Sequence, residues 1–258
     1  MSKKLQKKQK GFTLVELSIV LVIIGLIISS VLVGQDLVRG AELRAVVTQY
    51  ESFNAAVGTF RGKYNGIPGD VRAETDFGFV GNGDGDTLLG ASTDLTAGTT
   101  ATPANDNGEN VQFWNHLGST GAALISGSYD GAAVTAATAS DTLPSTKIGE
   151  FWGVFSDGSS NYFMLGVTGG ASGVYLTSDV LNPLDAQNID NKIDDGQPRR
   201  GIVHARAGNA TNADTAATYN ATAGNAAACV TGTANNNAVT YNTQNDAVVC
   251  TLRLRFNL

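Results

Sequence analysis

Residues 12–33 read FTLVELSIVLVIIGLIISSVLV, and this apolar run decides the fold of the chain. It holds 22 residues and one charged side chain, Glu16. At about 1.5 Å per residue, a helix of this length crosses the roughly 30 Å hydrocarbon core of a bilayer. Because buried helices of soluble proteins are seldom apolar over such a length, the sequence predicts a transmembrane helix over residues 12–34.

Glu16 is the unusual residue of the run, because a carboxylate inside a membrane is costly and rare without a functional reason. It stands fifth in the run, near one end. Two interpretations remain open from the residues alone. The side chain can reach back to the polar surface of the bilayer, or it can bind a positively charged partner within the membrane.

Residues 10–17, KGFTLVEL, resemble the prepilin signature of type IV pilins and type II secretion pseudopilins. The match comprises a short basic leader, residues 1–11, that ends in Gly11, followed by Phe12 and by Glu16 at the family's spacing. The resemblance implies that a prepilin peptidase cleaves between Gly11 and Phe12 and that the new amine of Phe12 is methylated. It also implies that Glu16 pairs with the terminal amine of a neighbouring subunit and so aligns helices as a fibre grows.

The leader carries the positive charge that sets the expected orientation. Its five lysines are Lys3, Lys4, Lys7, Lys8 and Lys10. Positive flanks of a membrane span stay in the cytoplasm, so we expect a cytoplasmic N-terminus and an exported C-terminal part. The only small-residue candidate for signal-peptide cleavage is the weak pair Ser29-Ser30, so we expect the helix to be retained.

The remainder of the chain is acidic. The formal net charge is −6, and loss of the leader with its five lysines leaves −11 over 247 residues. Arg199-Arg200 is the one adjacent pair of basic residues after the leader. Nucleic-acid binding depends on neutralising phosphates with basic groups, so we expect no nucleic-acid partner.

A one-sided apolar stripe continues beyond the membrane run. Its members are three and four residues apart: Leu43, Val46, Tyr50, Phe53, Val57, Phe60 and Tyr64. This spacing predicts an amphipathic helix over residues 35–64. We expect it to continue the apolar run, so that one helix extends from about Phe12 to about Tyr64. A coiled-coil dimer is the alternative, but the aromatic content of the stripe favours packing against a sheet.

Residues 65–258 are expected to form an exported globular domain with low-complexity loops. Asn65 to Asp70 (NGIPGD) should end the helix. Residues 109–125, interrupted by Gly118 and Gly121, should contain a short helix that packs Trp114 into the core. Residues 151–155, 162–167 and 173–176 are short apolar runs separated by turn residues, which predicts an antiparallel meander. Residues 182–188 should form a helix capped by Asn182. Residues 207–228, rich in Ala, Asn, Thr and Gly, are expected to lack regular structure.

The last strand has the clearest pattern. In residues 248–256 one face carries Val248, Cys250, Leu252, Leu254 and Phe256, and the other carries Arg253 and Arg255. Strict alternation predicts that the first face packs on a core and the second faces water. Together these elements predict an α+β, pilin-like fold, in which a long N-terminal helix packs on an antiparallel sheet.

Cys229 and Cys250 are the two cysteines of the chain. In an oxidising compartment such a pair is most simply one disulfide. Two separate thiols or half of a metal site are the alternatives, although no third cysteine or histidine lies nearby in the sequence. Many pilins have a disulfide near the C-terminus, so the resemblance to pilins also favours a Cys229–Cys250 disulfide.

Chemistry-bearing residues are sparse, and we expect no enzyme. His116 and His204 stand in no catalytic pattern, and His116 is interpreted as a packed side chain. Calcium is the candidate cofactor, because Asn82, Asp84 and Asp86 alternate with glycines as oxygen ligands do in calcium loops. The acid seven residues after Asp86 that an EF-hand would need is replaced by Thr93, so a polar turn is the alternative. A second oxygen-rich loop holds Asp190, Asp194 and Asp195, with a solvated turn as its alternative.

The function predicted from these observations is polymerisation. By resemblance the chain is a leader-cleaved, single-pass inner-membrane subunit that enters a periplasmic or extracellular fibre, either a pilus (fimbrium) or a type II secretion pseudopilus. Its expected partners are other pilin-like subunits in a homo- or heteropolymer, the prepilin peptidase, the inner-membrane assembly machinery and the membrane. The alternative function is a membrane-tethered minor pilin that acts as a calcium-stabilised adhesin.

Overall fold

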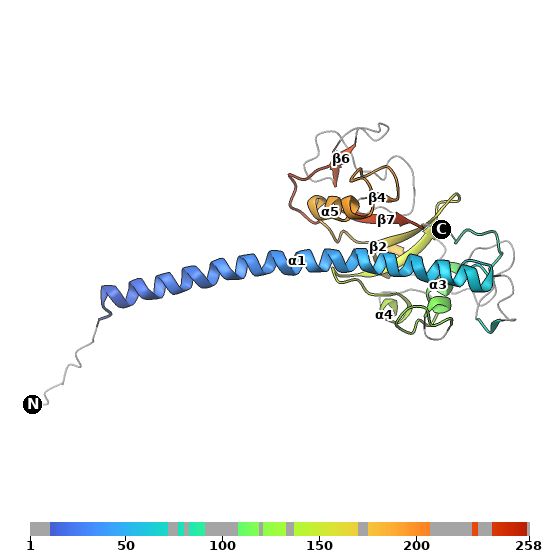
Figure 1. The fold of residues 1–258 in the computed structure, drawn as a ribbon, viewed down its shortest axis with the longest axis horizontal. Helices are drawn as coiled ribbons and strands as arrows, with labels where there is room; N and C mark the ends of the chain where they lie inside the picture. The colour runs from blue at the N-terminus through green and yellow to red at the C-terminus, as the bar shows by residue number, and fades with distance from the viewer. Residues whose placement is uncertain are drawn as a thin grey trace, which may run out of the picture. The chain divides into compact units, whose positions relative to one another are not determined.

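The computed structural model describes residues 11–71, 77–79, 83–90, 108–118, 121–132, 137–169, 175–206, 229–231 and 239–256. The chain divides into two compact units, Met1–Glu42 and Leu43–Leu258. The boundary between them falls inside the first helix, α1 (Leu14–Tyr64), which Figure 1 labels. The predicted low-complexity segment 207–228 lies outside the described residues.

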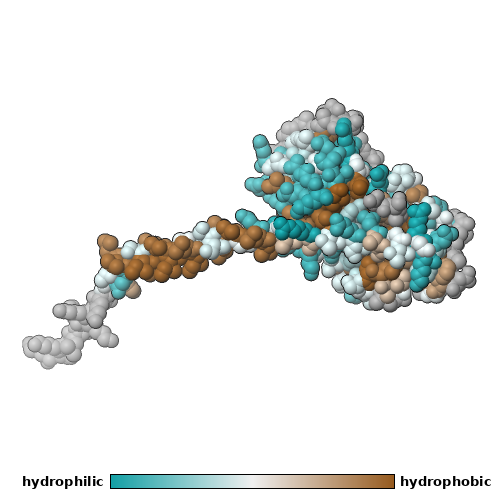
Figure 2. Space-filling model, viewed as in Figure 1, coloured by the Kyte–Doolittle hydropathy of each residue, from teal (hydrophilic) through white to brown (hydrophobic). Residues whose placement is uncertain are grey.

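The part of α1 in the first unit is apolar and exposed. Its large apolar side chains from Leu14 to Val38 are 47–85% exposed, and Figure 2 shows hydrophobic surface along this stretch. By length and composition α1 is able to cross a membrane, and its most apolar window is 0% buried. The prediction of one long helix ending at Tyr64 is confirmed.

The part of α1 in the second unit buries the predicted stripe. Its buried residues are Leu43, Val46, Tyr50, Phe53, Ala56, Val57 and Phe60. The ring of Phe53 lies 5.7 Å from that of Trp152 and 5.9 Å from that of Phe163, both in the sheet. The stripe therefore packs on the chain's own sheet, and the coiled-coil alternative is not needed to explain it.

The sheet is antiparallel and has the order β1-β2-β7-β4, with β3 also paired to β2. Its strands are β1 (Phe151–Ser156), β2 (Asn161–Gly169), β3 (Tyr175–Thr177), β4 (Val203–Arg206) and β7 (Thr251–Arg255). The predicted meander is confirmed as β1, β2 and β3, whereas β4 was not anticipated. A separate two-stranded sheet pairs β5 (Val230–Thr231) with β6 (Thr240–Tyr241).

Three shorter helices complete the second unit: α3 (Glu109–Leu117), α4 (Ala139–Thr142) and α5 (Pro183–Ile193). Trp114 of α3 is 0% exposed, as predicted. The short helix ends at Leu117, directly before Gly118, and at Gly121 an added Cβ would lie 2.4 Å from the carbonyl oxygen of His116. In α5 the Asn182 side chain accepts a hydrogen bond from the Asp185 backbone at 2.7 Å, so the predicted cap is confirmed.

Strand β7 corrects one sequence prediction. Cys250, Leu252, Leu254 and Phe256 are buried as expected, but Val248 is 53% exposed. Arg253, expected to face water, is only 5% exposed. It is buried because its guanidinium lies 4.7 Å from the ring centre of Tyr162 and donates to Nδ1 of His204 on the neighbouring strand β4. The second face of β7 is therefore covered at Arg253, whereas Arg255 on the same face is exposed as predicted.

Candidate functional site

The N-terminal segment of the described chain is fully accessible. Phe12 is 92% exposed, and a Cβ added at Gly11 would meet no atom within 4 Å. Nothing in the described part of the chain therefore requires a glycine at position 11 for packing. A requirement for Gly11 would have to come from another molecule.

Thr13 and Glu16 form a capping box at the start of α1. Oε2 of Glu16 accepts hydrogen bonds from the backbone N–H of Thr13 at 2.7 Å and from its hydroxyl at 2.9 Å. In return, the backbone N–H of Glu16 donates to the Thr13 hydroxyl oxygen at 3.3 Å. Reciprocal bonds of this kind satisfy donors that a helix start otherwise leaves without partners.

The capping role of Glu16 was missed at the sequence level, although its signal was readable. Thr13-Leu14-Val15-Glu16 is the pattern Thr-x-x-Glu directly before an apolar run, which is typical of a capping box. Glu16 thus has a structural role in the single chain in addition to any role between chains.

A first group of carboxylates lies in the second unit and is made by Asp70, Asp84 and Glu109. One oxygen from each lies within 4.8 Å of the others, and the residues Asp70 and Glu109 are 2% and 3% exposed. The backbone N–H of Asp84 donates to Oε1 of Glu109 at 3.2 Å. Oxygen atoms gathered in this way are the ligands that calcium prefers.

Asp70 is the centre of this group. Burial raises its pKa to about 6, although its carboxylate accepts hydrogen bonds from the backbone of Gly85 at 2.5 Å and of Thr87 at 2.7 Å. A Cβ at Gly83 would lie 2.3 Å from the Asp70 Cα, so a glycine lets the 83–90 segment approach this closely.

The predicted calcium ligands are only partly brought together in this region. Asp84 belongs to the group, whereas Asp86 does not, and Oδ1 of Asp86 instead accepts from the backbone of Leu88 at 2.7 Å. Asn82 lies outside the described residues. Asp70 and Glu109 were missed because they are distant in sequence and meet only through the fold, and no local spacing marks them.

The second predicted group, Asp190, Asp194 and Asp195, is brought together within 4.8 Å. Asp190 is 0% exposed and accepts hydrogen bonds from the Tyr241 hydroxyl at 2.8 Å and the Gly196 backbone at 3.2 Å. Burial raises the pKa of Asp190 to about 6, and Asp194 accepts hydrogen bonds from the backbone of Ile202 and Val203. These bonds join α5 to β6 and to the start of β4, so two of the three carboxylates already have a structural role.

The two cysteines form a disulfide with a Cα–Cα distance of 5.1 Å. Cys250 also exchanges backbone hydrogen bonds with Leu181 at 2.9 and 3.1 Å. The disulfide therefore ties the β5–β6 hairpin to the residues that lead into β7.

His116 is a packed side chain, as predicted. It is 0% exposed, its ring stacks on Phe79 at 4.7 Å, and its Nδ1 accepts from the backbone of Gly69 at 2.9 Å.

Comparison with known proteins identifies the N-terminal region. Residues 6–32 match the family model described as the prokaryotic N-terminal methylation motif. No curated protein and no solved structure gives a significant match to the chain. The matched residues contain Gly11, Phe12 and the Thr13–Glu16 capping box at the start of the exposed apolar helix. The chain therefore carries the N-terminal methylation motif that is the signature of type IV pilins and pseudopilins, and its described residues form a long N-terminal helix and an antiparallel sheet, an α+β architecture.

Proposed function

We propose that this chain is a structural subunit that polymerises by helix packing into a type IV pilus or a type II secretion pseudopilus. The observation that carries the proposal is the exposed apolar part of α1 headed by the methylation motif. An apolar helix surface of this extent needs either lipid or other helices as its surroundings. Lipid would hold the subunit before assembly, and neighbouring helices would replace the lipid within the fibre.

The proposed sequence of events begins at Gly11 and Phe12. A prepilin peptidase cleaves the peptide bond between them on the cytoplasmic side, and the amine of Phe12 is then methylated. Both residues are accessible, as a substrate of another enzyme must be. The span keeps the rest of the chain on the periplasmic side of the inner membrane until assembly.

Glu16 is proposed to select the position of each incoming subunit. Both of its hydrogen bonds from Thr13 end on Oε2, and within the described residues Oε1 accepts none. Oε1 is therefore placed to accept the positively charged Phe12 amine of a neighbouring subunit. A charge-assisted hydrogen bond of this kind is strong in a medium that excludes water.

Processing is tested by mass spectrometry of the chain expressed with and without a prepilin peptidase. The expected product begins at a methylated Phe12, and Gly11→Leu should block cleavage. Gly25→Ala is the matched control, because a Cβ at Gly25 also meets no atom within 4 Å. An intact leader in the presence of an active peptidase would rule out the proposal.

A membrane-tethered minor pilin that acts as a calcium-stabilised adhesin is the second candidate. The group of Asp70, Asp84 and Glu109 favours it. Two of these carboxylates are buried and the third lies beside them, so they repel one another unless one binds a proton or the group binds a cation such as calcium. Calcium should then raise the melting temperature of the wild type and of Asp86→Asn, but not of Asp84→Asn. An unchanged melting temperature of the wild type with calcium and with chelator would contradict calcium binding.

A further inference from the structure

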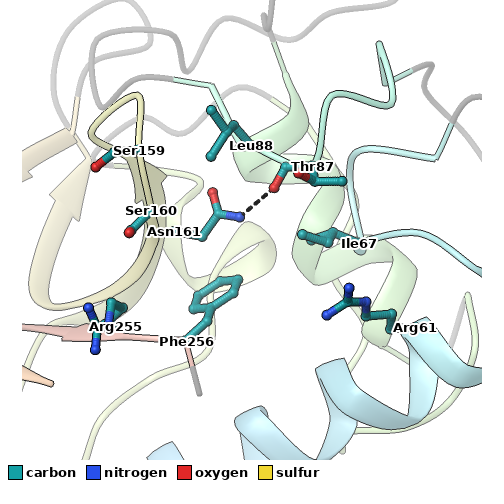
Figure 3. Close-up of a pocket in the computed structure, with 9 residues that line it drawn as sticks. All are labelled: Arg61, Ile67, Thr87, Leu88, Ser159, Ser160, Asn161, Arg255 and Phe256. Carbon is teal, nitrogen blue, oxygen red and sulfur yellow. Dashed lines mark hydrogen bonds between the residues drawn. The ribbon is translucent and has the colours of Figure 1, made fainter. Parts of the chain in front are cut away.

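A pocket of about 240 Å³ lies in the second unit beside the C-terminal turn of α1, the β1–β2 turn and the end of β7. Its lining includes Arg61, Leu88, Ser160, Asn161, Arg255 and Phe256. Figure 3 shows that these side chains come from separate parts of the chain and that Phe256 lies between the two arginines. Neither the methylation motif nor fibre assembly accounts for this pocket.

The two arginines supply the positive charge of the pocket. The Arg255 backbone is fixed, because its N–H donates to Ile202 and its carbonyl accepts from the Tyr50 hydroxyl, both at 2.9 Å. The side chains of Arg61 and Arg255 are exposed, and within the described residues neither forms an ion pair. Guanidinium groups bind carboxylates and phosphates with well-defined geometry.

The remaining walls are rigid and combine polar with apolar groups. The Asn161 amide donates to the Thr87 carbonyl and accepts from the Leu89 backbone, each at 2.8 Å, which holds the 83–90 segment in place. The Phe256 ring packs against Phe163 with ring centres 4.3 Å apart. A fixed aromatic surface beside hydroxyl and amide groups is suited to a ligand with both apolar and hydroxylated faces.

Nearby carboxylates limit how much negative charge the ligand can carry. Asp157 accepts hydrogen bonds from the backbone of Ser159 at 3.0 Å and of Ser160 at 2.9 Å, and its pKa is lowered by hydrogen bonds of this kind even though burial opposes them. Asp70 likewise accepts from Thr87. Carboxylates bound to the pocket-lining backbone would repel a phosphate dianion more strongly than a singly charged anion, so a singly charged anion suits the pocket better.

We propose that this pocket binds a sugar that carries a carboxylate, such as one uronic acid unit of an acidic glycan. The carboxylate would lie between Arg61 and Arg255, and the ring would lie on Phe256 with its hydroxyls toward Ser160 and Asn161. The volume is below the range of about 300–1,000 Å³ that is typical for drug-sized ligands, which limits the occupant to one small ring. The proposal is independent of polymerisation, because every residue in it belongs to the second unit.

The test is a calorimetric titration of the full chain in detergent micelles with glucuronate, with glucose as the neutral counterpart and inorganic phosphate as the dianion. Glucuronate should bind at least about tenfold more tightly than glucose, since a charged hydrogen bond contributes more than a neutral one. Arg61→Gln and Arg255→Gln should each weaken glucuronate binding by about tenfold. Arg44→Gln, an exposed arginine on the same helix, is the matched control and should bind as the wild type does.

The melting temperature of each variant shows whether a loss of binding reflects unfolding. Equal affinities for glucuronate and glucose would overturn the proposal, as would wild-type binding by both pocket variants. Tighter binding of phosphate than of glucuronate would also overturn it, because repulsion by the neighbouring carboxylates would then not select a singly charged ligand. Failure of leader processing or fibre assembly would leave these results unaffected.

Discussion

Thr13 donates both its backbone N–H and its hydroxyl to the same oxygen of Glu16, at 2.7 and 2.9 Å. The glutamate that would align neighbouring subunits therefore also starts the helix of its own chain. Removing it would change two properties at once, and an assembly defect in an alanine variant could not be assigned to either one.

Glu16→Gln separates the two roles, because glutamine also completes a capping box but carries no charge. We expect it to retain the start of α1 and membrane insertion, yet to reduce incorporation into fibres by at least about tenfold, since a charged hydrogen bond is lost. Glu16→Ala should lose both properties. Counting subunits in isolated fibres and measuring the membrane-bound fraction tests this.

Glu42→Gln is the control for a charge change elsewhere in the first unit, where Glu42 pairs with Arg39 at 3.3 Å. Its fibre incorporation should match that of the wild type. Normal assembly of Glu16→Gln would show that the charge of Glu16 has no role between subunits.

The disulfide should contribute strongly to the stability of the second unit. Cys229 and Cys250 are separated by 21 residues, and closing a loop of that length stabilises a fold by about 3 kcal/mol in the chain-entropy model. The double variant Cys229→Ser/Cys250→Ser should lose about this free energy of unfolding in a denaturant titration. Reducing agent should lower the stability of the wild type and leave that of the double variant unchanged; equal sensitivity in both would contradict a stabilising disulfide.

Asp190 should make stability depend on pH. Burial raises its pKa in the folded chain to about 6, above its ordinary value, so the folded state binds the proton more tightly than the unfolded state does. Protonated Asp190 therefore adds to the free energy of unfolding. This contribution is fully present below the pKa of the unfolded state and is lost as the pH rises toward and through 6. Asp190→Asn removes this dependence while retaining an oxygen that accepts from Tyr241.

The melting temperature of Asp190→Asn relative to the wild type should therefore increase between about pH 4 and pH 7, measured with chelator present. Asp246→Asn, at an exposed position, is the control for replacing an aspartate by asparagine elsewhere in the second unit. A constant difference for Asp190→Asn would show that its carboxyl group titrates alike in both states.

Arg253 should tolerate substitution poorly despite its charged side chain. Its guanidinium stacks on Tyr162 and donates through Nε to His204 at 3.1 Å, which a lysine cannot reproduce. Arg253→Lys should lower the free energy of unfolding by about 1–3 kcal/mol. Arg255 on the same strand has an exposed side chain, so Arg255→Lys should change the free energy of unfolding by less than about 0.5 kcal/mol. Equal effects of the two substitutions would contradict the structural role of Arg253.

The elements with a strong period were predictable from the sequence. The apolar run and the stripe that ends at Tyr64 specify α1, because a helical period identifies which residues share a face. The start of α5 was also predictable, because Asn182 caps a helix with its side chain and Pro183 favours the first helical position. Both effects act on neighbouring backbone and can be identified from the local sequence.

Features that depend on distant residues were not predictable. Alternation in β7 placed Arg253 and Arg255 on one face, but it carries no information on whether that face is covered. β4 covers the flank of Arg253 with His204, and β4 itself was missed because Val203–Arg206 is too short to show a period. The group of Asp70, Asp84 and Glu109 likewise exists only once the helix α3 has packed beside the 83–90 segment.

The position of β7 has a consequence for the order of folding. This strand is the last element of the chain, yet it lies inside the sheet between β2 and β4, and within the described residues β4 pairs with no other strand. The Tyr50 hydroxyl also donates a hydrogen bond to the carbonyl of Arg255, which lies 205 residues later in the chain. Pairings of such long range are slow to form, so we expect the sheet to stay open until β7 itself has been synthesised. Without β7, β4 would have no partner strand among the described residues, and the sheet would be divided between β2 and β4.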